Sequence, residues 1–254
     1  MINIVDWVRY SYNKKNLTLG QQGVELEKVS CWWVAGCIGW TGDILAVGKK
    51  KRAAQILDLL QQEFPNAGTM LEFGDTFQLL VAVILSAQST DVQVNRVTGQ
   101  LFSRYKTARD FAEADLEELE EAIRGVGLYR TKASNIQKMA HILLEKYQGQ
   151  VPDDFDELMK LPGIGRKTAN VMMSVGFGQP GLGVDTHVHR VSNRLGLVEE
   201  KTPDKTELAL KAIIPRRRWS QAHHLLIFHG RKTCTARKPK CPACVINHLC
   251  DKRL

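Results

Sequence analysis

The residues of this chain best suited to covalent chemistry are a lysine and an aspartate at the two ends of one predicted helix. Lys167 lies two residues past the segment 162–165, Pro-Gly-Ile-Gly. A tight turn is predicted there, because proline lacks a backbone donor and glycine readily adopts positive φ. Residues 169–176 then repeat apolar side chains at helical spacing, and Asp185 opens a second amphipathic run. The positive end of a helix disfavours an ammonium, which favours the neutral, nucleophilic form of such a lysine.

Each of these features also has a purely structural interpretation. Lysines are mostly solvated surface charges or phosphate contacts, and Asp185 before Thr186 is a good helix N-cap pair. For the turn, the functional interpretation is an anion site: its backbone N–H groups would bind a phosphate, and Gly163 and Gly165 would allow the phosphate to approach the chain closely. An ordinary helix–turn–helix corner fits the same residues, so the sequence alone leaves these alternatives open.

Positive charge is concentrated in the last fifth of the chain. The 254 residues carry a formal net charge of +8, and residues 199–254 hold 13 Lys and Arg against 5 Asp and Glu, whereas the preceding residues balance. Such a bias suits a polyanion and makes nucleic acid the leading class of partner, although a solvated basic surface fits as well. A composition of 44% hydrophobic and 24% charged residues is that of a globular protein.

Four cysteines near the C-terminus have the spacing of ligands to one metal centre. Cys234, Cys241, Cys244 and Cys250 follow the pattern C-x6-C-x2-C-x5-C, and the other two cysteines lie near the N-terminus. A disulfide pair is the competing interpretation, but an intracellular nucleic-acid-binding protein is expected to keep its thiols reduced. Four thiolates suit both Zn²⁺ and a [4Fe–4S] cluster, so the chemistry of the ligands does not choose between them.

The elements that must position these residues are predicted to be helices throughout. No stretch alternates convincingly as a strand does, so we predict an all-α fold. Residues 77–87 are apolar nearly all round, which predicts a helix buried in the middle of a domain. Further helices are expected at 53–64, 92–102, 116–123, 133–147, 205–213 and 219–229.

A faint internal repeat adds a second candidate nucleophile. Residues 125–136 echo residues 163–171, each with G-x-G, a basic residue, alanine and asparagine leading into a helix. The first copy carries Lys132, so spacing alone does not select Lys167.

Residues 1–48 differ from the rest of the chain. They contain an uncharged run at 29–42 with three tryptophans. This run is too short to span a bilayer and lies too deep in the chain for a secretory signal. We expect the segment to be a dispensable extension that is disordered or non-native, with Val47 a plausible original initiator.

The string LPGIGRKTANV at 161–171, followed by VDTHVHRV at 184–191, resembles the helix–hairpin–helix and Gly/Pro-Asp signature of a DNA glycosylase superfamily. Within it, the resemblance is to the endonuclease III family and runs from about residue 49 to 254. It implies two lobes: a six-helix, barrel-like domain at 69–179 that carries the hairpin, and an iron–sulfur domain built from 49–68 and 180–254.

The resemblance also implies roles for individual residues. Lys167 would attack the anomeric carbon of a damaged nucleoside with help from Asp185, and Gln88 would fill the gap left by the extruded base. Gly163 and Gly165 would donate backbone amides to a DNA phosphate. A [4Fe–4S] cluster would be held by Cys234, Cys241, Cys244 and Cys250, and the loop between the first two would contact the DNA backbone through Arg237, Lys238 and Lys240.

The function implied is a bifunctional DNA glycosylase and abasic-site lyase that excises oxidised pyrimidines in base-excision repair, through a lysine Schiff base and β-elimination. We expect a cytoplasmic, nucleoid-associated monomer that acts on double-stranded DNA with damaged bases or abasic sites, and no membrane partner. Two alternatives remain: a non-catalytic helix–hairpin–helix DNA-binding protein, and a monofunctional adenine-mismatch glycosylase. The adenine-mismatch glycosylases typically lack the hairpin lysine and carry a further C-terminal domain, whereas here only four residues follow Cys250.

Overall fold

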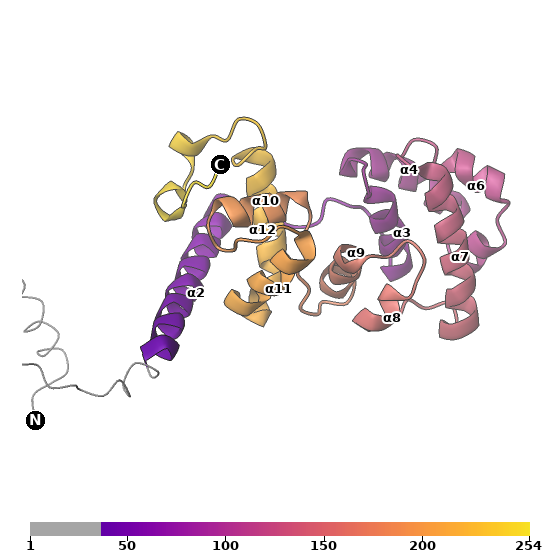
Figure 1. Ribbon diagram of the computed structural model, residues 1–254. Coiled ribbons are helices and arrows are strands. Elements are labelled where there is room, and N and C mark those ends of the chain that lie inside the picture. The colour runs from indigo at the N-terminus through magenta and orange to yellow at the C-terminus, as the bar shows by residue number, and fades with distance from the viewer. Residues whose placement is uncertain (1–36) are drawn as a thin grey trace, which may run out of the picture. The chain divides into compact units, whose positions relative to one another are not determined.

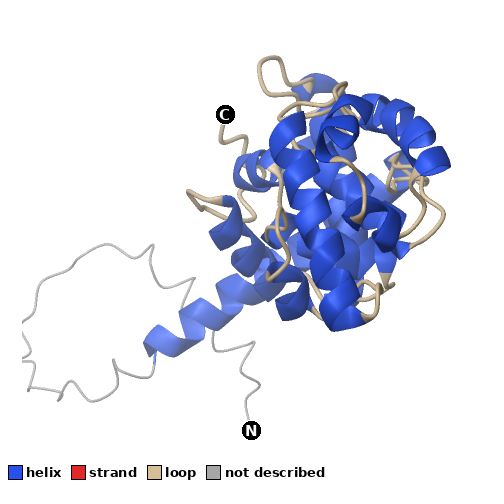
Figure 2. Cartoon of the chain, turned by 90° about the vertical axis from the view of Figure 1, so that its right-hand side faces the viewer, coloured by secondary structure: helices blue, strands red, loops and turns tan. Residues whose placement is uncertain are grey.

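The computed structural model describes residues 37–254, and every regular element in that range is helical, which confirms the all-α prediction (Figures 1 and 2). The predictions for residues 1–36 lie outside the described part of the chain. None of the helices in the described part is long and apolar enough to cross a membrane. The elements are α2 (Cys37–Glu63), α3 (Thr76–Ser86), α4 (Asp91–Arg104), α5 (Ala108–Ala112), α6 (Leu116–Ala122), α7 (Tyr129–Tyr147), α8 (Phe155–Met159), α9 (Arg166–Val171), the π-helical turn η2 (Met172–Gly176), α10 (Thr186–Arg194), α11 (Pro203–Ile213) and α12 (Trp219–Lys232), with 3₁₀ turns η3 (Arg216–Arg218), η4 (Cys241–Ala243) and η5 (Asn247–Leu249).

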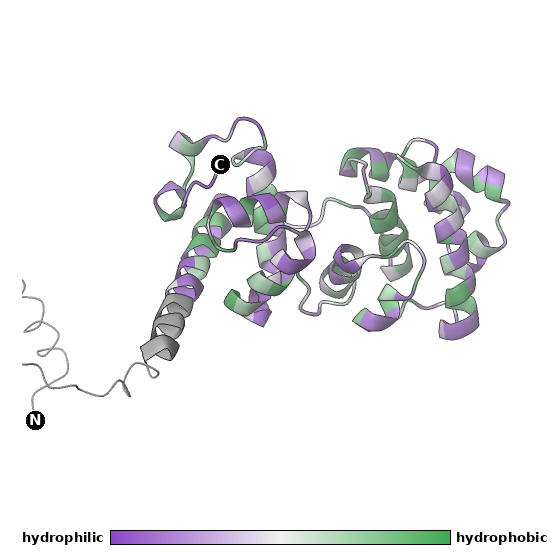
Figure 3. Ribbon diagram, in the orientation of Figure 1, coloured by the Kyte–Doolittle hydropathy of each residue, from purple (hydrophilic) through white to green (hydrophobic). Residues whose placement is uncertain are grey.

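Helix α3 is the buried centre that its apolar sequence predicts. Asp75 begins it as an N-cap whose carboxylate accepts a hydrogen bond from the backbone N–H of Gln78, at 2.8 Å. Every side chain of α3 from Phe77 to Leu85 except Gln78 is buried, and Figure 3 shows the helix as mostly hydrophobic. Burial of each large apolar side chain stabilises the fold by ~1.5–3 kcal/mol relative to exposure, so α3 organises the helices packed around it.

The structure differs from the predicted helices at four places. Helix α2 begins at Cys37, well before residue 53, and no proline lies between these positions to interrupt it. The predicted helix through residue 176 is α-helical only as far as Val171 and ends as the π-helical turn η2. Helices α5 and α8 were not predicted, since five residues are too few to show helical periodicity.

Two separate groups of buried apolar side chains form hydrophobic cores. The first contains α3 and the helices α4 to α9, with members from Phe77 to Met173. The second joins residues 53–64, on the C-terminal part of α2 and directly after it, to residues 182–246 on and around α10, α11 and α12. The early helix α2 thus shares a core with the C-terminal part of the chain. The domain boundaries proposed after residues 68 and 179 remain predictions.

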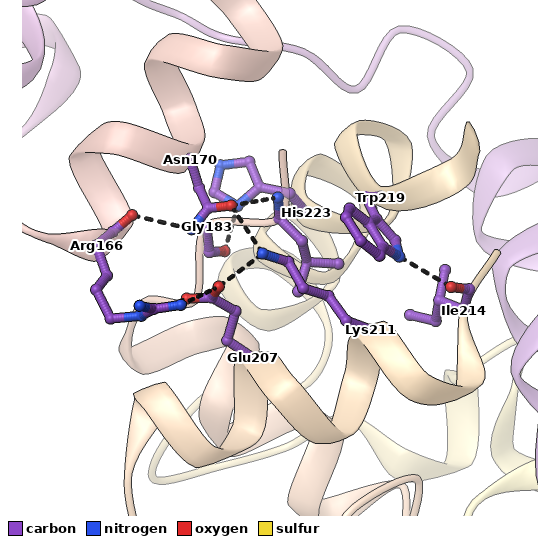
Figure 4. Close-up of polar contacts among 9 residues, drawn as sticks. Arg166, Asn170, Gly183, Glu207, Lys211, Ile214, Trp219 and His223 are labelled. Atoms are coloured by element: carbon purple, nitrogen blue, oxygen red, sulfur yellow. Dashed lines mark hydrogen bonds and ion pairs between the residues drawn. The ribbon is translucent and has the colours of Figure 1, made fainter. Parts of the chain in front are cut away.

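A buried carboxylate joins α9 to α11 across these two cores (Figure 4). Glu207 of α11 is 1% exposed, and its Oε1 accepts hydrogen bonds from Arg166 Nη2 at 2.8 Å and Lys211 Nζ at 2.7 Å. Lys211 also donates to the Asn170 side chain at 3.2 Å, and the same Asn170 oxygen accepts from the Leu182 backbone at 3.1 Å. Because Arg166 and Asn170 lie on α9, this network fixes the helix that carries Lys167.

Replacing Glu207 by Gln is expected to lower the free energy of unfolding at pH 7 by about 3 kcal/mol, because two cations would be left beside a neutral amide. Burial raises the pKa of Glu207, but hydrogen bonds from Arg166 and Lys211 outweigh it and hold the pKa below its ordinary 4.5. The stabilisation should therefore be complete above pH 4.5 and be lost as pH falls through the lowered pKa. Urea unfolding of both proteins at several pH values measures this.

The matched control is Glu118→Gln, which breaks an exposed ion pair with Arg104. Surface pairs contribute about 0–1 kcal/mol, so this variant should unfold almost as the parent does. Equal losses from both substitutions would contradict a special role for the buried carboxylate.

Candidate active site and metal centre

Lys167 and Asp185 line the same cleft. The cleft is open to solvent, and its wall also contains the end of α3 with the loop to α4, residues 86–91. A second, smaller pocket is lined by both residues as well. The structure therefore brings the two residues together in one space, as the chemistry predicted for them requires.

Each of the two side chains is positioned by a helix start. Lys167 is the second residue of α9 and is exposed to solvent, and the N-cap of this helix is Gly165 in an extended conformation. Asp185 is the N-cap of α10, where its Oδ1 accepts a hydrogen bond from the Val188 backbone N–H at 2.8 Å. The structure thus confirms that Asp185 is an N-cap, and the same residue also lines the cleft.

The second candidate lysine lies elsewhere. Lys132 is 5% exposed, and its Nζ donates hydrogen bonds to the carbonyls of Leu85 at 2.8 Å and Ala87 at 2.6 Å. Its amine is therefore engaged at the end of α3, and Lys167 is the lysine of the repeat that lines the cleft.

The residues predicted to contact DNA lie at the cleft rim and on the hairpin. Gln88 lines the cleft, is exposed, and has a left-handed backbone with φ +56°. Gly163 and Gly165 are both exposed on the hairpin turn, outside the residues that line the cleft. Gly163 has φ +79°, and a Cβ there would lie 3.1 Å from the Cβ of Asn135, so the turn requires glycine.

The second pocket contains polar groups to which the sequence analysis assigned no role in the active site. An ion pair of 2.7 Å joins Asp91 of α4 to Arg231 of α12, and both line the cleft and the pocket. His223 is buried on the same wall, with its Nδ1 2.6 Å from the carbonyl oxygen of Gly183. Burial, with a smaller contribution from His224, lowers the pKa of His223 to about 4, so at neutral pH the ring is uncharged and its Nδ1–H donates to Gly183. No local spacing links these residues; only the fold brings them together.

The four C-terminal cysteines surround a space of about 370 Å³. All four are half-buried free thiols. Arg194 Nη1 donates to Cys234 Sγ at 3.7 Å, and the imidazole nitrogen Nε2 of His229 lies 3.8 Å from Cys244 Sγ, so polar nitrogen atoms face two of the sulfurs. Among the described residues, no three His, Cys, Asp or Glu side chains are placed to share one metal ion. A cubane cluster does not require that arrangement, because each of its four thiolates binds a different iron atom, and a ring of sulfurs around a common space fits it.

The loop between the first two cysteines is held by one arginine. Arg194 of α10 donates to the carbonyls of Thr235 and Ala236, both at 2.8 Å. This arrangement leaves three predicted DNA contacts exposed to solvent: Arg237, Lys238 and Lys240.

Comparison with known proteins gives two family matches. Residues 81–216, more than half of the chain, match the family described as "HhH-GPD superfamily base excision DNA repair protein". Residues 234–250 match the "Iron-sulfur binding domain of endonuclease III". The first match covers every residue that lines the cleft except Arg231, and the second covers the four cysteines.

Individual relatives agree with these matches. Endonuclease III of Bacillus subtilis is 50% identical over 195 residues, covering 76% of this chain and 89% of that protein. Endonuclease III of Escherichia coli is 44% identical over 202 residues, covering 80% and 96%. A solved structure described as a trapped endonuclease III–DNA covalent intermediate is 51% identical, with a TM-score of 0.77 over 80% of this chain and 96% of that one. A family match over most of the cleft, joined to relatives of this identity and coverage, shows that the chain belongs to the endonuclease III family.

Proposed function

We propose that this chain is the DNA glycosylase and abasic-site lyase of its family and that it excises oxidised pyrimidines with Lys167 as nucleophile. The observation that carries the proposal is an exposed amine that shares a cleft with a carboxylate, Asp185. A non-catalytic DNA-binding protein would not need that pair. The monofunctional adenine-mismatch branch typically lacks a lysine at the position of Lys167.

The Lys167 amine would form a C–N bond to the anomeric carbon of the damaged nucleoside while the glycosidic bond breaks and the base leaves with its electron pair and a proton. Ring opening gives an imine, which acidifies the neighbouring sugar carbon. Loss of a proton from that carbon expels the 3′ phosphate, and water then releases the lysine. Asp185 would receive a proton from the lysine or stabilise positive charge that develops on the sugar.

The substrate we propose is double-stranded DNA with a damaged base or an abasic site. A stacked base is out of reach of the cleft, so it must be flipped, which is easiest for lesions that weaken pairing or stacking. Gln88 on the cleft rim would fill the space left in the duplex. Backbone amides at Gly163 and Gly165, and the basic loop at 237–240, would contact phosphates without reading sequence. We expect a cytoplasmic, nucleoid-associated monomer.

A [4Fe–4S] cluster bound by the four cysteines would supply structural cross-links to the C-terminal segment. Apart from the short turns η4 and η5, residues 234–250 have no regular structure, and Ile246 is the buried apolar residue among them. So small an apolar contribution leaves the fold of this segment dependent on its metal centre.

Replacing Lys167 by Gln is expected to abolish trapping of the enzyme on DNA by borohydride, because the reduced imine requires this amine. DNA binding should persist, since the hairpin and the basic loop are unchanged. Gel analysis of the trapped complex measures this. The control is Lys160→Gln, which removes an exposed lysine paired with Glu157 near the hairpin and should leave trapping intact. Persistent trapping by the Lys167 variant would assign the nucleophile to another amine.

Two variants of Asp185 separate its chemistry from its capping role. Asp185→Asn keeps an N-cap acceptor for Val188 but removes the negative charge, so base excision should fall by about 10²–10⁴-fold with little loss of stability. Asp185→Ala loses the cap as well and should also lower the free energy of unfolding by about 1 kcal/mol. Single-turnover kinetics measure the rate of base excision, and urea unfolding measures the free energy of unfolding. Full activity of the Asn variant would exclude a catalytic carboxylate.

Freshly purified protein is expected to be brown and to contain about four iron atoms per chain, as a cubane cluster requires. Cys244→Ala should lose the iron and make residues 234–250 sensitive to protease. Val245→Ala, at the adjacent exposed position, should keep the metal. Iron analysis and limited proteolysis test this, and colourless protein with stoichiometric zinc would refute the cluster.

A further inference from the structure

The first copy of the hairpin repeat, residues 125–136, is not part of the cleft wall but contacts the loop that carries Gln88. Lys132 of α7 is 5% exposed, and its ammonium reaches the C-terminal end of α3. There it donates to the carbonyls of Leu85 and Ala87, at 2.8 and 2.6 Å. A helix end leaves its last carbonyls without partners inside the helix and carries partial negative charge, so a buried cation suits this place.

The chain turns sharply at this helix end. In a continuing helix the Leu85 carbonyl would accept from the N–H of Ser89, but that N–H instead bonds to the Ser86 carbonyl at 3.2 Å. Lys132 therefore takes the position of the missing helical donor. Its second bond, to Ala87, holds the carbonyl directly before Gln88.

Gln88 has a backbone conformation that needs such support. Its φ of +56° lies in the left-handed region, which non-glycine residues adopt only when their surroundings fix them there. On the far side of Gln88, the hydroxyl of Ser89 accepts a hydrogen bond from the Gly127 N–H at 3.1 Å. A Cβ on Gly127 would lie 3.2 Å from the Gln88 carbonyl oxygen, so the first repeat copy packs directly against this residue.

We propose that Lys132 is a positioning residue for base extrusion. It fixes the backbone of Gln88 so that this side chain projects from the cleft rim toward the duplex, and it takes no part in the covalent step. The two lysines of the repeat thus serve the same reaction differently: Lys167 lines the cleft, and Lys132 supports the loop behind it. The proposal rests on the function proposed above for Gln88.

The test compares two DNA substrates that differ in their need for base extrusion. One is a duplex with an oxidised pyrimidine, and the other is a single strand with a preformed abasic site, which has no opposite base and no base to flip. Lys132→Met removes the ammonium and keeps most of the side-chain stem. It should slow single-turnover excision from the duplex on the order of 10- to 100-fold, because a displaced loop no longer inserts correctly. Strand cleavage and borohydride trapping on the single strand should stay near the wild-type level.

Coupling to Gln88 is measured with a double variant. Gln88→Ala should show the same selective loss, and adding Lys132→Met to it should cause little further loss, because each change prevents the same insertion of the Gln88 side chain. A 2-aminopurine placed opposite the lesion should brighten on binding of the wild-type enzyme and much less with either variant. Lys138→Met on the exposed face of the same helix is the matched control and should match the wild type on both substrates.

Ser89→Ala provides a second route to the loop if the Lys132 variant folds poorly. It removes the acceptor for the Gly127 N–H and should give the same selective pattern with a smaller effect. Equal losses on both substrates, or additive losses in the double variant, would overturn the positioning role and leave Lys132 as a general support of the fold. Failure of the wild-type enzyme to cleave the abasic strand would instead contradict the Lys167 chemistry, so the two failures are distinguishable.

Discussion

The arrangement of the cleft depends on the buried carboxylate of Glu207. A carboxylate that is 1% exposed is tolerated only when it is paired, and its partners here are Arg166 and Lys211. Arg166 precedes Lys167 directly, so the ion pair sets the rotation of α9 and, with it, the side of the helix from which the amine projects. A buried salt link is weak evidence of net stabilisation, and we infer that its main effect here is to select one arrangement of α9 and α11.

A close backbone approach completes the same arrangement. The Asn170 side chain accepts from the Leu182 N–H at 3.1 Å, and a Cβ on Gly181 would lie 2.1 Å from the Asn170 carbonyl oxygen. Only glycine allows residues 181–184 to run against α9 at this distance. The segment then delivers Asp185 to the start of α10 on the same cleft as Lys167. Lys167 and Asp185 are 18 positions apart in the sequence. They line one cleft because Gly181 and Asn170 allow the two segments that carry them to pack closely.

Local sequence signals predicted the parts of the site that local interactions determine. The N-cap at Asp185 and the buried helix α3 follow from residue type and periodicity within a few turns. The cysteine ring follows from spacing within one short segment. By contrast, the ion pair of Asp91 and Arg231 joins residues 140 positions apart, and the burial of His223 depends on the packing of α12. No pattern in the nearby sequence therefore predicts the ion pair or the buried histidine.

The two copies of the repeat show why a motif alone could not assign the nucleophile. Lys132 and Lys167 both follow a G-x-G turn near a helix start, yet one is buried and the other exposed. The difference comes from what faces each lysine: Lys132 meets the end of α3, whose carbonyls it satisfies, whereas Lys167 meets an open cleft. Burial lowers the pKa of Lys132, but its Nζ is already committed to two carbonyls and has no access to a sugar. A reactive amine must combine a suitable environment with an open approach, and of the two copies only the second provides that approach.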